Sequence, residues 1–496
     1  MGAREACGVF GISSEVCDIS QVTYKGLHAL QHRGQESAGI ALSNGSDVFA
    51  YKKMGLVTQV FTPEVLAVLR GRIAIGHVRY STTGSSVEYN AQPIVVRLPV
   101  PSASREEEPP RGDRPPSRDG GLRLEDPALA IAHNGNIVNA EALRNDLVAE
   151  GIRPHGSTDS EVMAWHLLQA HMAGGEEALV RRFGRFQGAI SVTVLLKDRL
   201  IAARDMNGFR PLCLGRLNGD WVVASESCVF SIIRAEFVRE IEPGEVVIIE
   251  GRNLRSERYT PAPQPKVCAF EYVYFSRPDS HFGGRLVYAV RRRLGEILAD
   301  EQPAEADLVI GIPDSGTIAA AGYSAKSGIP LETGFVKNRY IGRTFIQPHP
   351  LQRENEVEIK LNPLKEVVEG KRLVVVDDSI VRGTTIRRII AMLREAGAKE
   401  VHIRISSPPI QNPCYYGIDF PTYEELTAAN LDVDEICRKI GADSLGYLSV
   451  EGLHAAMELG ETACNACFTG KYPIPVPQQL RLYGAKAILE PRDPEP

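Results

Sequence analysis

Two adjacent acids, Asp377 and Asp378, end an apolar run in the stretch Leu373–Thr385. The valines before them are β-branched and almost continuous, which is typical of a parallel strand that is buried on both faces. Isoleucines recur at helical spacing after Thr385, so a helix is predicted there, with Gly397 as its end. The loop in between offers hydroxyls, a cation and backbone amides at a helix N-terminus, which together could bind a phosphate. The two acids would then face sugar hydroxyls or Mg²⁺ at the carboxyl end of the strand.

A second loop between a predicted strand and a predicted helix, Pro313–Thr317, also carries hydroxyls and could hold pyrophosphate or its metal. Strands that end in acids are common, so a general magnesium site of the Walker B type is an alternative for Asp377 and Asp378. The sequence contains no G-x-x-x-x-G-K-[ST] motif, which argues against a nucleoside triphosphatase.

Near the start of the chain, Cys7 begins a predicted strand. A cysteine in this position could simply be a small buried apolar residue. It is accompanied, however, by polar motifs, most of which place a glycine beside an apolar segment. These motifs occupy residues 31–39, 76–84, 133–136 and 157–161. Together they favour a reactive thiol.

In this order, the motifs resemble the glutaminase domains of the N-terminal-nucleophile amidotransferases over most of the amino-terminal half. The resemblance implies an α+β sandwich of two antiparallel sheets with flanking helices. Cys7 would attack the side-chain amide of glutamine, while the Asn134 side chain and the Gly135 backbone amide stabilise the oxyanion. Arg79 would pair with the carboxylate of glutamine, and Asp159 with its ammonium group.

This chemistry needs no histidine as the base if residues 1–6 are removed as a propeptide. The α-amino group of Cys7 would then be free, and its ordinary pKa of about 7.7 to 8.0 suits proton transfer from a thiol. Cleavage of the propeptide is therefore a chemical requirement of the glutaminase hypothesis.

The other candidate residues also have simpler explanations. Asn134 and Gly135 could form a turn. Arg79 could belong to a surface ion pair, and Asp159 could be a helix N-cap. Three histidines could form a metal site, although the resemblance assigns them to packing and orientation: His32, His77 and His133.

The stretch Leu373–Thr385 resembles the fingerprint of the type I phosphoribosyltransferases, which implies an α/β domain with a mainly parallel sheet. Combined with the glutaminase motifs, nearly the whole chain resembles the glutamine phosphoribosylpyrophosphate amidotransferases. The resemblance implies that Ser315, Asp377 and Asp378 bind Mg²⁺. This metal would ease the departure of pyrophosphate from phosphoribosylpyrophosphate (PRPP), so that ammonia can trap the ribosyl cation.

The same resemblance assigns the phosphate groups of PRPP. Lys337 and Arg339 would contact pyrophosphate from a basic loop that covers the substrate and excludes water. The residues implied to bind the 5-phosphate are Ser379, Ile380, Val381, Arg382, Gly383 and Thr384.

Cys464 and Cys467 are separated by two residues, a spacing that occurs in zinc sites, in redox pairs and by chance. Together with Cys268 and Cys414 they resemble the ligands of the 4Fe–4S cluster in one branch of the amidotransferase family. That resemblance implies a structural cluster, with zinc as the alternative because thiolates bind both metals. The remaining cysteines are predicted to be ordinary buried thiols: Cys17, Cys213, Cys228 and Cys437.

The chain that must position these residues has 496 residues, too many for one ordinary core, so two large domains are expected. The predicted parts are a propeptide at 1–6, a glutaminase domain at 7–250, a linker at 251–266, a phosphoribosyltransferase domain at 267–470 and a tail at 471–496. The segment 99–127, rich in proline and charge, is predicted to be a disordered insertion.

The formal net charge of −6 gives no reason to expect nucleic acid or an anionic membrane as a partner. No apolar run approaches the roughly 18 residues of a membrane-spanning helix and no secretory signal precedes Cys7, so a cytoplasmic protein is predicted. The resemblance implies the first committed step of purine synthesis, with glutamine and PRPP as substrates, purine nucleotides as inhibitors and a homotetramer. Two alternatives remain: a PRPP-sensing regulator, which would not need the Cys7 domain, and another glutaminase-coupled enzyme such as a glucosamine-phosphate synthase, which would lack the Asp377–Asp378 fingerprint.

Overall fold

The computed structural model describes residues 7–15, 17–80, 86–98, 128–338, 361–420, 422–481 and 489. The predicted propeptide, the predicted insertion at 99–127 and Arg339 in the basic loop lie outside these residues. In the part of the chain that is described, no helix is both long enough and apolar enough to cross a membrane.

The chain divides into two compact units. The amino-terminal unit contains Ala6–Gln264, together with Tyr415–Gly417 and the segment from Val476 onward. The carboxyl-terminal unit contains Pro265–Cys414 and Ile418–Pro475. The carboxyl-terminal part of the sequence is therefore divided between both units.

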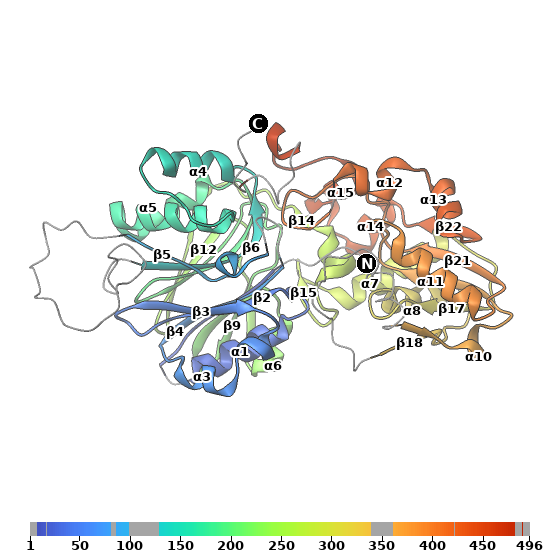
Figure 1. Cartoon of the computed structure of the whole chain (residues 1–496), viewed down its shortest axis with the longest axis horizontal. Helices are drawn as coiled ribbons and strands as arrows, with labels where there is room; N and C mark the ends of the chain where they lie inside the picture. Colours follow the sequence, from blue (N-terminus) through green and yellow to red (C-terminus); the bar gives the residue numbers. More distant parts are fainter. Residues whose placement is uncertain are drawn as a thin grey trace, which may run out of the picture. The chain divides into compact units, whose positions relative to one another are not determined.

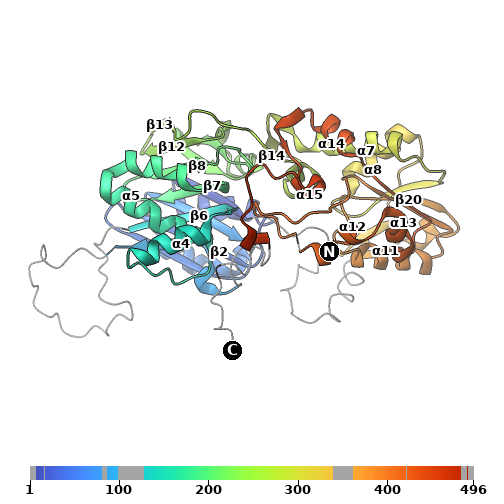
Figure 2. The same ribbon diagram turned by 90° about the horizontal axis from the view of Figure 1, so that it is seen from above.

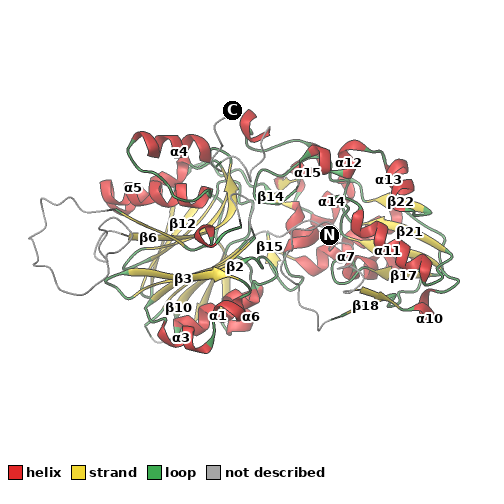
Figure 3. Cartoon of the chain, in the orientation of Figure 1, coloured by secondary structure: helices red, strands yellow, loops and turns green. Residues whose placement is uncertain are grey.

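The amino-terminal unit consists of two antiparallel sheets packed face to face, with helices on both outer sides, as the sequence predicted (Figures 1 and 3). The first sheet has the strand order β11-β9-β10-β1-β4-β2-β3. Its strands are β1 (Gly8–Ser13), β2 (Ser37–Ser43), β3 (Val48–Met54), β4 (Ile73–Arg79), β9 (Cys213–Leu217), β10 (Asp220–Ala224) and β11 (Glu236–Glu240). The second sheet has the order β13-β12-β8-β7-β6-β5. Its strands are β5 (Ile94–Arg97), β6 (Ala128–Ile137), β7 (Gly188–Leu195), β8 (Leu200–Arg204), β12 (Glu245–Glu250) and β13 (Asn253–Arg258).

The helices of this unit form its two outer layers (Figure 1). Those beside the first sheet are α1 (Ile19–Ala29), α2 (Val57–Val60), α3 (Pro63–Val68) and α6 (Cys228–Ile233), and those beside the second are α4 (Ala140–Ala149) and α5 (Asp159–Arg182). Successive residues of β1 face different cores. Val9 lies in the core between the sheets, whereas Phe10 and Ile12 lie in the core that includes α1. This alternation has the period of a strand and fixes the register of the chain directly after Cys7.

The carboxyl-terminal unit is built on a parallel sheet of order β17-β20-β21-β22, and helices cover both faces of this sheet (Figure 2). The strands are β17 (Leu308–Gly311), β20 (Arg372–Asp377), β21 (Glu400–Ile405) and β22 (Ser444–Tyr447). The helices on one face are α7 (Val287–Glu301), α8 (Thr317–Ser327) and α14 (Val450–Met457), and on the other α11 (Thr384–Glu395) and α13 (Val433–Ile440). The short strands β14 (Val267–Cys268) and β23 (Ala463–Cys464), β15 (His281–Phe282) and β16 (Arg285–Leu286), and β18 (Phe335–Lys337) and β19 (Leu361–Pro363) form three separate pairs.

Strand β20 is buried on both faces, as its run of valines predicted. Val374 and Val376 lie in the core that contains α7 and α8, whereas Leu373 and Val375 lie in the core that contains α11. This packing brings the end of β20, and therefore Asp377, to the carboxyl edge of the sheet.

The predicted domain boundaries differ from the structure in two places. Residues 253–258, assigned to the linker, form β13 and pair with β12, so the unit changes only after Gln264. β13 is an edge strand with mostly exposed, charged side chains, and such a strand resembles a polar linker in sequence. The predicted phosphoribosyltransferase span is also interrupted, because Tyr415–Gly417 belong to the amino-terminal unit.

The segment after the predicted linker is rich in aromatic residues, a composition that favours a strand, but most of it does not form one. Only Val267–Cys268 is extended, and Glu271–Phe275 forms a π-helical turn. Arg291 of α7 explains the turn, because Nε donates to the carbonyl of Tyr272 at 2.7 Å and Nη2 donates to those of Tyr274 at 2.6 Å and Ser276 at 2.8 Å. Tertiary contacts of this kind override the strand preference of aromatic residues.

We expect Arg291→Met to lower the free energy of unfolding of the carboxyl-terminal unit by about 3 kcal/mol, because three carbonyls lose a charged donor. Arg292→Met on the same helix is the matched control, since Arg292 is exposed and pairs with Glu296 one turn away. Urea unfolding followed by circular dichroism measures both variants. Equal stability of the two variants would refute the role given to Arg291.

Candidate active sites

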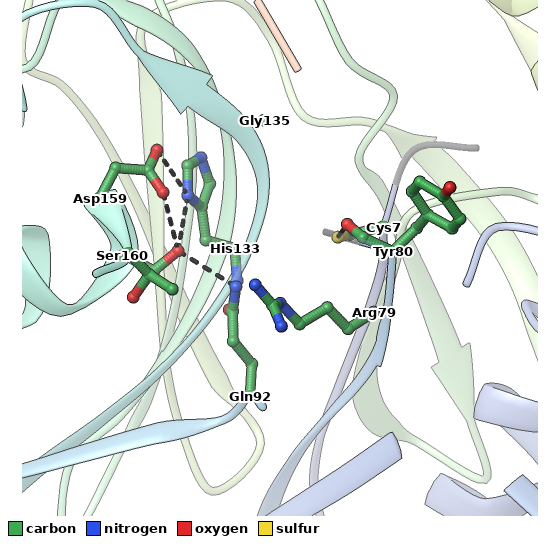
Figure 4. Close-up of a pocket in the computed structure, with 9 residues that line it drawn as sticks. Cys7, Arg79, Tyr80, Gln92, His133, Gly135, Asp159 and Ser160 are labelled. Atoms are coloured by element: carbon green, nitrogen blue, oxygen red, sulfur yellow. Dashed lines mark hydrogen bonds and ion pairs between the residues drawn. The ribbon is translucent and has the colours of Figure 1, made fainter. Parts of the chain in front are cut away.

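Cys7 directly precedes β1 and lies in a pocket built from separate segments of the amino-terminal unit (Figure 4). The pocket is lined by Cys7, Arg79, Tyr80, Gln92, His133, Gly135, Thr158, Asp159 and Ser160. Strand β4 ends at Arg79, β6 carries Gly135, and α5 begins at Asp159. Four of the five predicted glutaminase residues therefore line one pocket, and Asn134 is the neighbour of Gly135 in the chain.

Cys7 is almost fully buried, with 7% of the residue exposed. Its thiol donates a hydrogen bond to the carbonyl of Tyr80 over 3.2 Å, and Arg33 Nε donates to the carbonyl of Cys7 over 3.0 Å. Burial raises the pKa of the Cys7 thiol, and the charges of Arg79 and Arg33 oppose this rise. The thiol therefore needs a nearby base to become a nucleophile at neutral pH.

A buried ion pair holds Arg33 against Cys7. Arg33 Nη1 lies 2.6 Å from Glu226 Oε1, and the same oxygen lies 2.7 Å from His32 Nε2. Burial alone would raise the pKa of Glu226, but attraction to His32 and Arg33 lowers it below its ordinary value. Sequence reasoning missed Arg33 and Glu226 as site residues. Arg33 lies within the polar motif at 31–39 and could have been found, whereas nothing in the sequence marks Glu226 as its partner.

Opposite Cys7, a hydrogen-bond network surrounds Ser160 (Figure 4). Gln92 Nε2 donates to Ser160 Oγ over 3.1 Å, and His133 Nδ1 lies 3.1 Å from the same oxygen. The backbone N–H of His133 donates to Gln92 Oε1 over 2.7 Å. Asp159 Oδ2 accepts from the backbone N–H of Ile137 over 3.0 Å and lies 3.7 Å from His133 Nδ1. These contacts hold the Asp159 carboxylate at the first turn of α5.

The simpler explanations for Asp159 and Arg79 are wrong. The N-cap of α5 is Thr158, whose side chain accepts from the backbone of Glu161. Arg79 is only 2% exposed, so it does not belong to a surface ion pair, and its side chain extends toward Gln92 (Figure 4). A buried guanidinium and a buried carboxylate in one pocket suit the carboxylate and ammonium groups of an amino acid.

Asn134 and Gly135 lie within β6 and not in a turn; their register partners in β7 are Ser191 and Ile190. Gly135 has a φ of +148°, and a Cβ at this position would lie 2.0 Å from the carbonyl oxygen of Ala189, so a side chain cannot be accommodated. The Asn134 side chain is fully buried, and neither its Oδ1 nor its Nδ2 has a hydrogen-bond partner among the described residues. Such an amide is available to stabilise a reaction intermediate.

The three histidines considered as a metal site bind protein atoms instead. His77 Nε2 lies 3.0 Å from the carbonyl oxygen of His133, and burial lowers the pKa of His77 to about 3. His133 Nε2 lies 3.1 Å from the carbonyl oxygen of Ala189, and His32 pairs with Glu226. These contacts fit the role in packing and orientation.

In the carboxyl-terminal unit, the three residues expected to bind Mg²⁺ lie close together. Ser315 Oγ donates to Asp377 Oδ1 over 3.1 Å, and the backbone N–H of Asp378 donates to the same oxygen over 2.9 Å. Burial and the neighbouring Asp378 raise the pKa of Asp377, and burial raises that of Asp378. A buried pair of carboxyl groups with raised pKa values favours a bound cation.

The loop between β20 and α11 has the form expected of a phosphate site at a helix N-terminus. α11 begins at Thr384, directly after Gly383, which has a φ of +75°. The side chains of Ile380 and Val381 are buried, so these two residues can offer only their backbone to a ligand. Arg382 Nη2 lies 2.5 Å from a carboxylate oxygen of Glu425, so its charge is already paired.

Lys337 is the one residue of the expected pyrophosphate contacts that the structure describes. It ends β18, and its ammonium group pairs with the carboxylate of Asp314. Asp314 precedes Ser315, so Lys337 lies beside the loop that also holds the expected metal ligand.

The four cysteines expected to bind a cluster belong to the carboxyl-terminal unit. β14 and β23 pair in parallel with Cys268 opposite Cys464. Cys467 lies in α15 (Ala466–Thr469), and its carbonyl accepts from the backbone N–H of Asn412, two residues before Cys414. Burial raises the pKa of Cys467, and the charges of the other three thiols raise it further. Among the described residues, no three His, Cys, Asp or Glu side chains form a group that could hold a metal ion as they stand.

The sequence predicted that the other four cysteines are all buried, and this prediction is only half right. Cys213 and Cys228 are buried, whereas Cys17 and Cys437 are partly exposed. Cys17 lies just before α1 and packs against the edge of the core that includes this helix, and Cys437 lies on α13.

Two family models match parts of this chain. A glutamine amidotransferase domain matches residues 113–231, and a phosphoribosyl transferase domain matches residues 283–411. The chain is 48% identical to the amidophosphoribosyltransferase of Synechococcus elongatus over 495 residues, which covers 98% of this chain and 94% of the relative. It is 45% identical to that of Bacillus subtilis over 493 residues, which covers 98% of each chain.

Two solved structures resemble the whole fold. Glutamine phosphoribosylpyrophosphate amidotransferase from Bacillus subtilis, complexed with ADP and GMP, superposes with a TM-score of 0.84 at 45% identity, covering 95% of this chain and 98% of that one. A structure described as the allosteric regulatory enzyme of purine biosynthesis gives a TM-score of 0.84 at 46% identity, covering 95% and 97%.

The buried Glu226 predicts a pH-dependent loss of stability. Because its pKa is lower in the folded state, the charged carboxylate stabilises the fold above its ordinary pKa of 4.5, and this stabilisation is lost as the pH falls through the lower folded value. We expect Glu226→Gln to lower the unfolding free energy at pH 7 by about 3 kcal/mol, because Arg33 keeps a buried charge without its partner. The deficit should shrink below about pH 4.5.

Urea unfolding monitored by tryptophan fluorescence measures this difference, since both tryptophans, Trp165 and Trp221, lie in the amino-terminal unit. Glu236→Gln, at an exposed position on β11, is the control. A deficit that is independent of pH would contradict the role of the Glu226 charge.

Proposed function

The chain belongs to the amidophosphoribosyltransferases, and from this we propose which of its residues carry out each half of the reaction. The enzyme converts glutamine and PRPP to 5-phosphoribosylamine, glutamate and pyrophosphate, a step of purine biosynthesis. The family excludes a PRPP-sensing regulator and a glucosamine-phosphate synthase. The strongest support for the residue roles is the single pocket that Cys7, Arg79, Gly135 and Asp159 line from separate segments.

In the amino-terminal unit, Cys7 is the nucleophile. After removal of residues 1–6, its α-amino group takes the proton of the thiol, and the thiolate attacks the side-chain carbonyl carbon of glutamine. Collapse of the tetrahedral intermediate breaks the C–N bond, and the protonated nitrogen leaves as ammonia while a thioester remains on Cys7. Water then hydrolyses this thioester, which releases glutamate and restores the thiol.

The other residues of the pocket bind glutamine and stabilise the transition state. Arg79 pairs with the α-carboxylate, and Asp159, held by the N–H of Ile137, pairs with the α-ammonium group. The Asn134 amide and the backbone N–H of Gly135 donate to the oxyanion. The support for Asn134 is its buried amide, which has no partner among the described residues.

In the carboxyl-terminal unit, Ser315, Asp377 and Asp378 hold Mg²⁺, since hydroxyl and carboxylate oxygens are the ligands that this cation prefers. When bound, Mg²⁺ neutralises the charge that develops on the departing pyrophosphate. The two carboxylates also accept hydrogen bonds from the ribose hydroxyls and so orient the carbon that ammonia attacks.

We assign the phosphate groups of PRPP to two different segments of this unit. The 5-phosphate lies at the N-terminus of α11, on residues 379–384, where the backbone N–H groups and the hydroxyls of Ser379 and Thr384 are suited to an anion. Lys337 contacts the pyrophosphate from β18, and we assign the same role to Arg339, which lies outside the described residues.

The cysteines Cys268, Cys414, Cys464 and Cys467 are ligands of a 4Fe–4S cluster, with zinc as the alternative. The pairing of Cys268 with Cys464 and the mutual influence of the four thiols support a common site. When bound, a cluster cross-links three distant segments, so it stabilises this region of the fold.

Purine nucleotides act as inhibitors of the enzyme. The support comes from a relative, because the Bacillus subtilis amidotransferase is described in complex with ADP and GMP. We also propose a homotetramer, which rests on the resemblance alone.

The two-site scheme predicts that Cys7→Ala abolishes PRPP turnover with glutamine and leaves turnover with ammonium unchanged, because only the glutaminase step uses the thiol. Release of pyrophosphate in the presence of Mg²⁺ measures both reactions. Cys17→Ala, at a partly exposed cysteine of the same unit, is the control. Loss of both activities in Cys7→Ala would disprove the scheme. Mass spectrometry of the N-terminus of the unmodified enzyme tests the processing, and a chain that keeps residues 1–6 with full glutaminase activity would disprove the role of the α-amino group as the base.

The cluster predicts iron and acid-labile sulfide at about four of each per chain. Cys464→Ser should lower both contents and the temperature of unfolding, since one ligand is lost. Cys437→Ser, at a partly exposed cysteine, should change neither. Stoichiometric zinc without iron in the unmodified protein would establish the alternative metal.

A further inference from the structure

The segment Tyr415–Gly417 has no role in the function proposed so far. It belongs to the amino-terminal unit, although the chain up to Cys414 and the chain from Ile418 belong to the carboxyl-terminal unit. All three residues are buried, and both tyrosines are only 3% exposed. The chain therefore places three buried residues in the glutaminase unit from a distant part of the sequence.

Inside that unit, the segment is held by side chains on both sides. Asn136 Nδ2 donates to the carbonyl of Tyr415 over 2.9 Å, and Arg210 Nη2 donates to the carbonyl of Tyr416 over 3.0 Å. The rings of Phe209 and Tyr416 stack, with centroids 4.6 Å apart and planes 15° from parallel. The ring stack and the two hydrogen bonds fix the position of this segment within the amino-terminal unit.

These contacts connect the segment to β6, the strand that carries the candidate oxyanion hole. Asn136 directly follows Gly135 on β6. Arg210 is connected to the neighbouring strand β7, because its carbonyl accepts from Ser191 Oγ over 3.2 Å. Ser191 lies on β7 as the register partner of Asn134 on β6. The segment is thus tied to β6 and to the neighbouring strand at the same level.

Gly417 also approaches Gly135 closely. Gly417 has a φ of +94°, and a Cβ added there would lie 2.8 Å from the carbonyl carbon of Gly135 and 3.0 Å from its Cα. The backbone of Gly417 therefore packs against the backbone of Gly135 with no room for a methyl group.

We propose that Tyr415–Gly417 is a positioning segment for the oxyanion hole of the glutaminase, which it holds by fixing the backbone of Gly135. This inference rests on the proposed role of Asn134 and Gly135. An oxyanion donor is effective only about 2.7–3.1 Å from the place where the charge develops, so a small shift of Gly135 removes its contribution. The half of the sequence that binds PRPP thereby completes the site that makes ammonia.

Gly417→Ala tests the proposal, because its methyl group has to displace Gly135. We expect kcat with glutamine to fall about 10-fold or more, toward the ~10²–10³-fold cost of losing an oxyanion donor. KM for glutamine should stay within about twofold, since Arg79 and Asp159 are not moved. Turnover with ammonium and the rate of Cys7 alkylation by iodoacetamide should not change, because neither reaction forms an oxyanion in this pocket.

Two further variants of the full-length, processed enzyme make the test specific. Gly441→Ala is the control for the backbone strain, because Gly441 has a φ of +80° and no atom within 4 Å of an added Cβ. It should retain both activities. Asn136→Ala removes the bond to Tyr415 without adding bulk and should lower kcat with glutamine in the same direction, so it decides the question if Gly417→Ala does not fold.

The outcomes separate this inference from the function on which it rests. If Asn134→Ala lowers kcat with glutamine but Gly417→Ala and Asn136→Ala do not, the positioning role is wrong and the oxyanion hole stands. If Asn134→Ala has no effect, the oxyanion assignment itself is wrong. If Gly417→Ala slows Cys7 alkylation or turnover with ammonium as much as turnover with glutamine, the segment supports the fold in general and the positioning role is also overturned.

Discussion

In the reaction that we propose for the amino-terminal unit, the thiol of Cys7 has to react while it is buried. Burial raises the pKa of Cys7 and so opposes formation of the thiolate. The same burial strengthens the electrostatic interactions between the reacting groups and the charges around them. The pocket therefore holds charged and polar groups that burial would otherwise make costly. Two of the charged groups near the thiol have fixed partners: Arg33 binds Glu226, and Asp159 accepts from the N–H of Ile137. Asn134, without a partner among the described residues, is the exception that a reaction intermediate would satisfy.

In the carboxyl-terminal unit, the groups affected by burial are two adjacent carboxyl groups. Asp377 and Asp378 are buried side by side; burial raises the pKa of both carboxyl groups, and the charge of Asp378 raises that of Asp377 further. The parallel sheet creates this situation, because alternate residues of β20 fill cores on its two faces and bring the acids to the carboxyl edge. In the function that we propose, this site becomes favourable because a cation and a polyphosphate bind there together.

Local sequence predicted those parts of the structure in which neighbours in the chain form the feature. The valines of β20, the acids after it and the helix from Thr384 were predicted because strand, loop and helix follow one another. The pocket residues were predicted only through the order of their motifs, since nothing local brings Arg79 to Cys7. Glu226 was missed because its partner lies 193 residues away. β13 was taken for a linker because an exposed edge strand buries too few apolar residues to show a pattern.

The path of the chain through Tyr415–Gly417 could not be predicted from any pattern, yet physical reasons explain why so short a segment can hold a position. Docking this segment costs conformational entropy, which two hydrogen bonds alone would not offset. Both tyrosines are almost fully buried, and the ring of Tyr416 stacks on that of Phe209, so the burial of aromatic surface adds to the hydrogen bonds. These contacts within the amino-terminal unit explain how three residues can keep the backbone of Gly417 packed against that of Gly135.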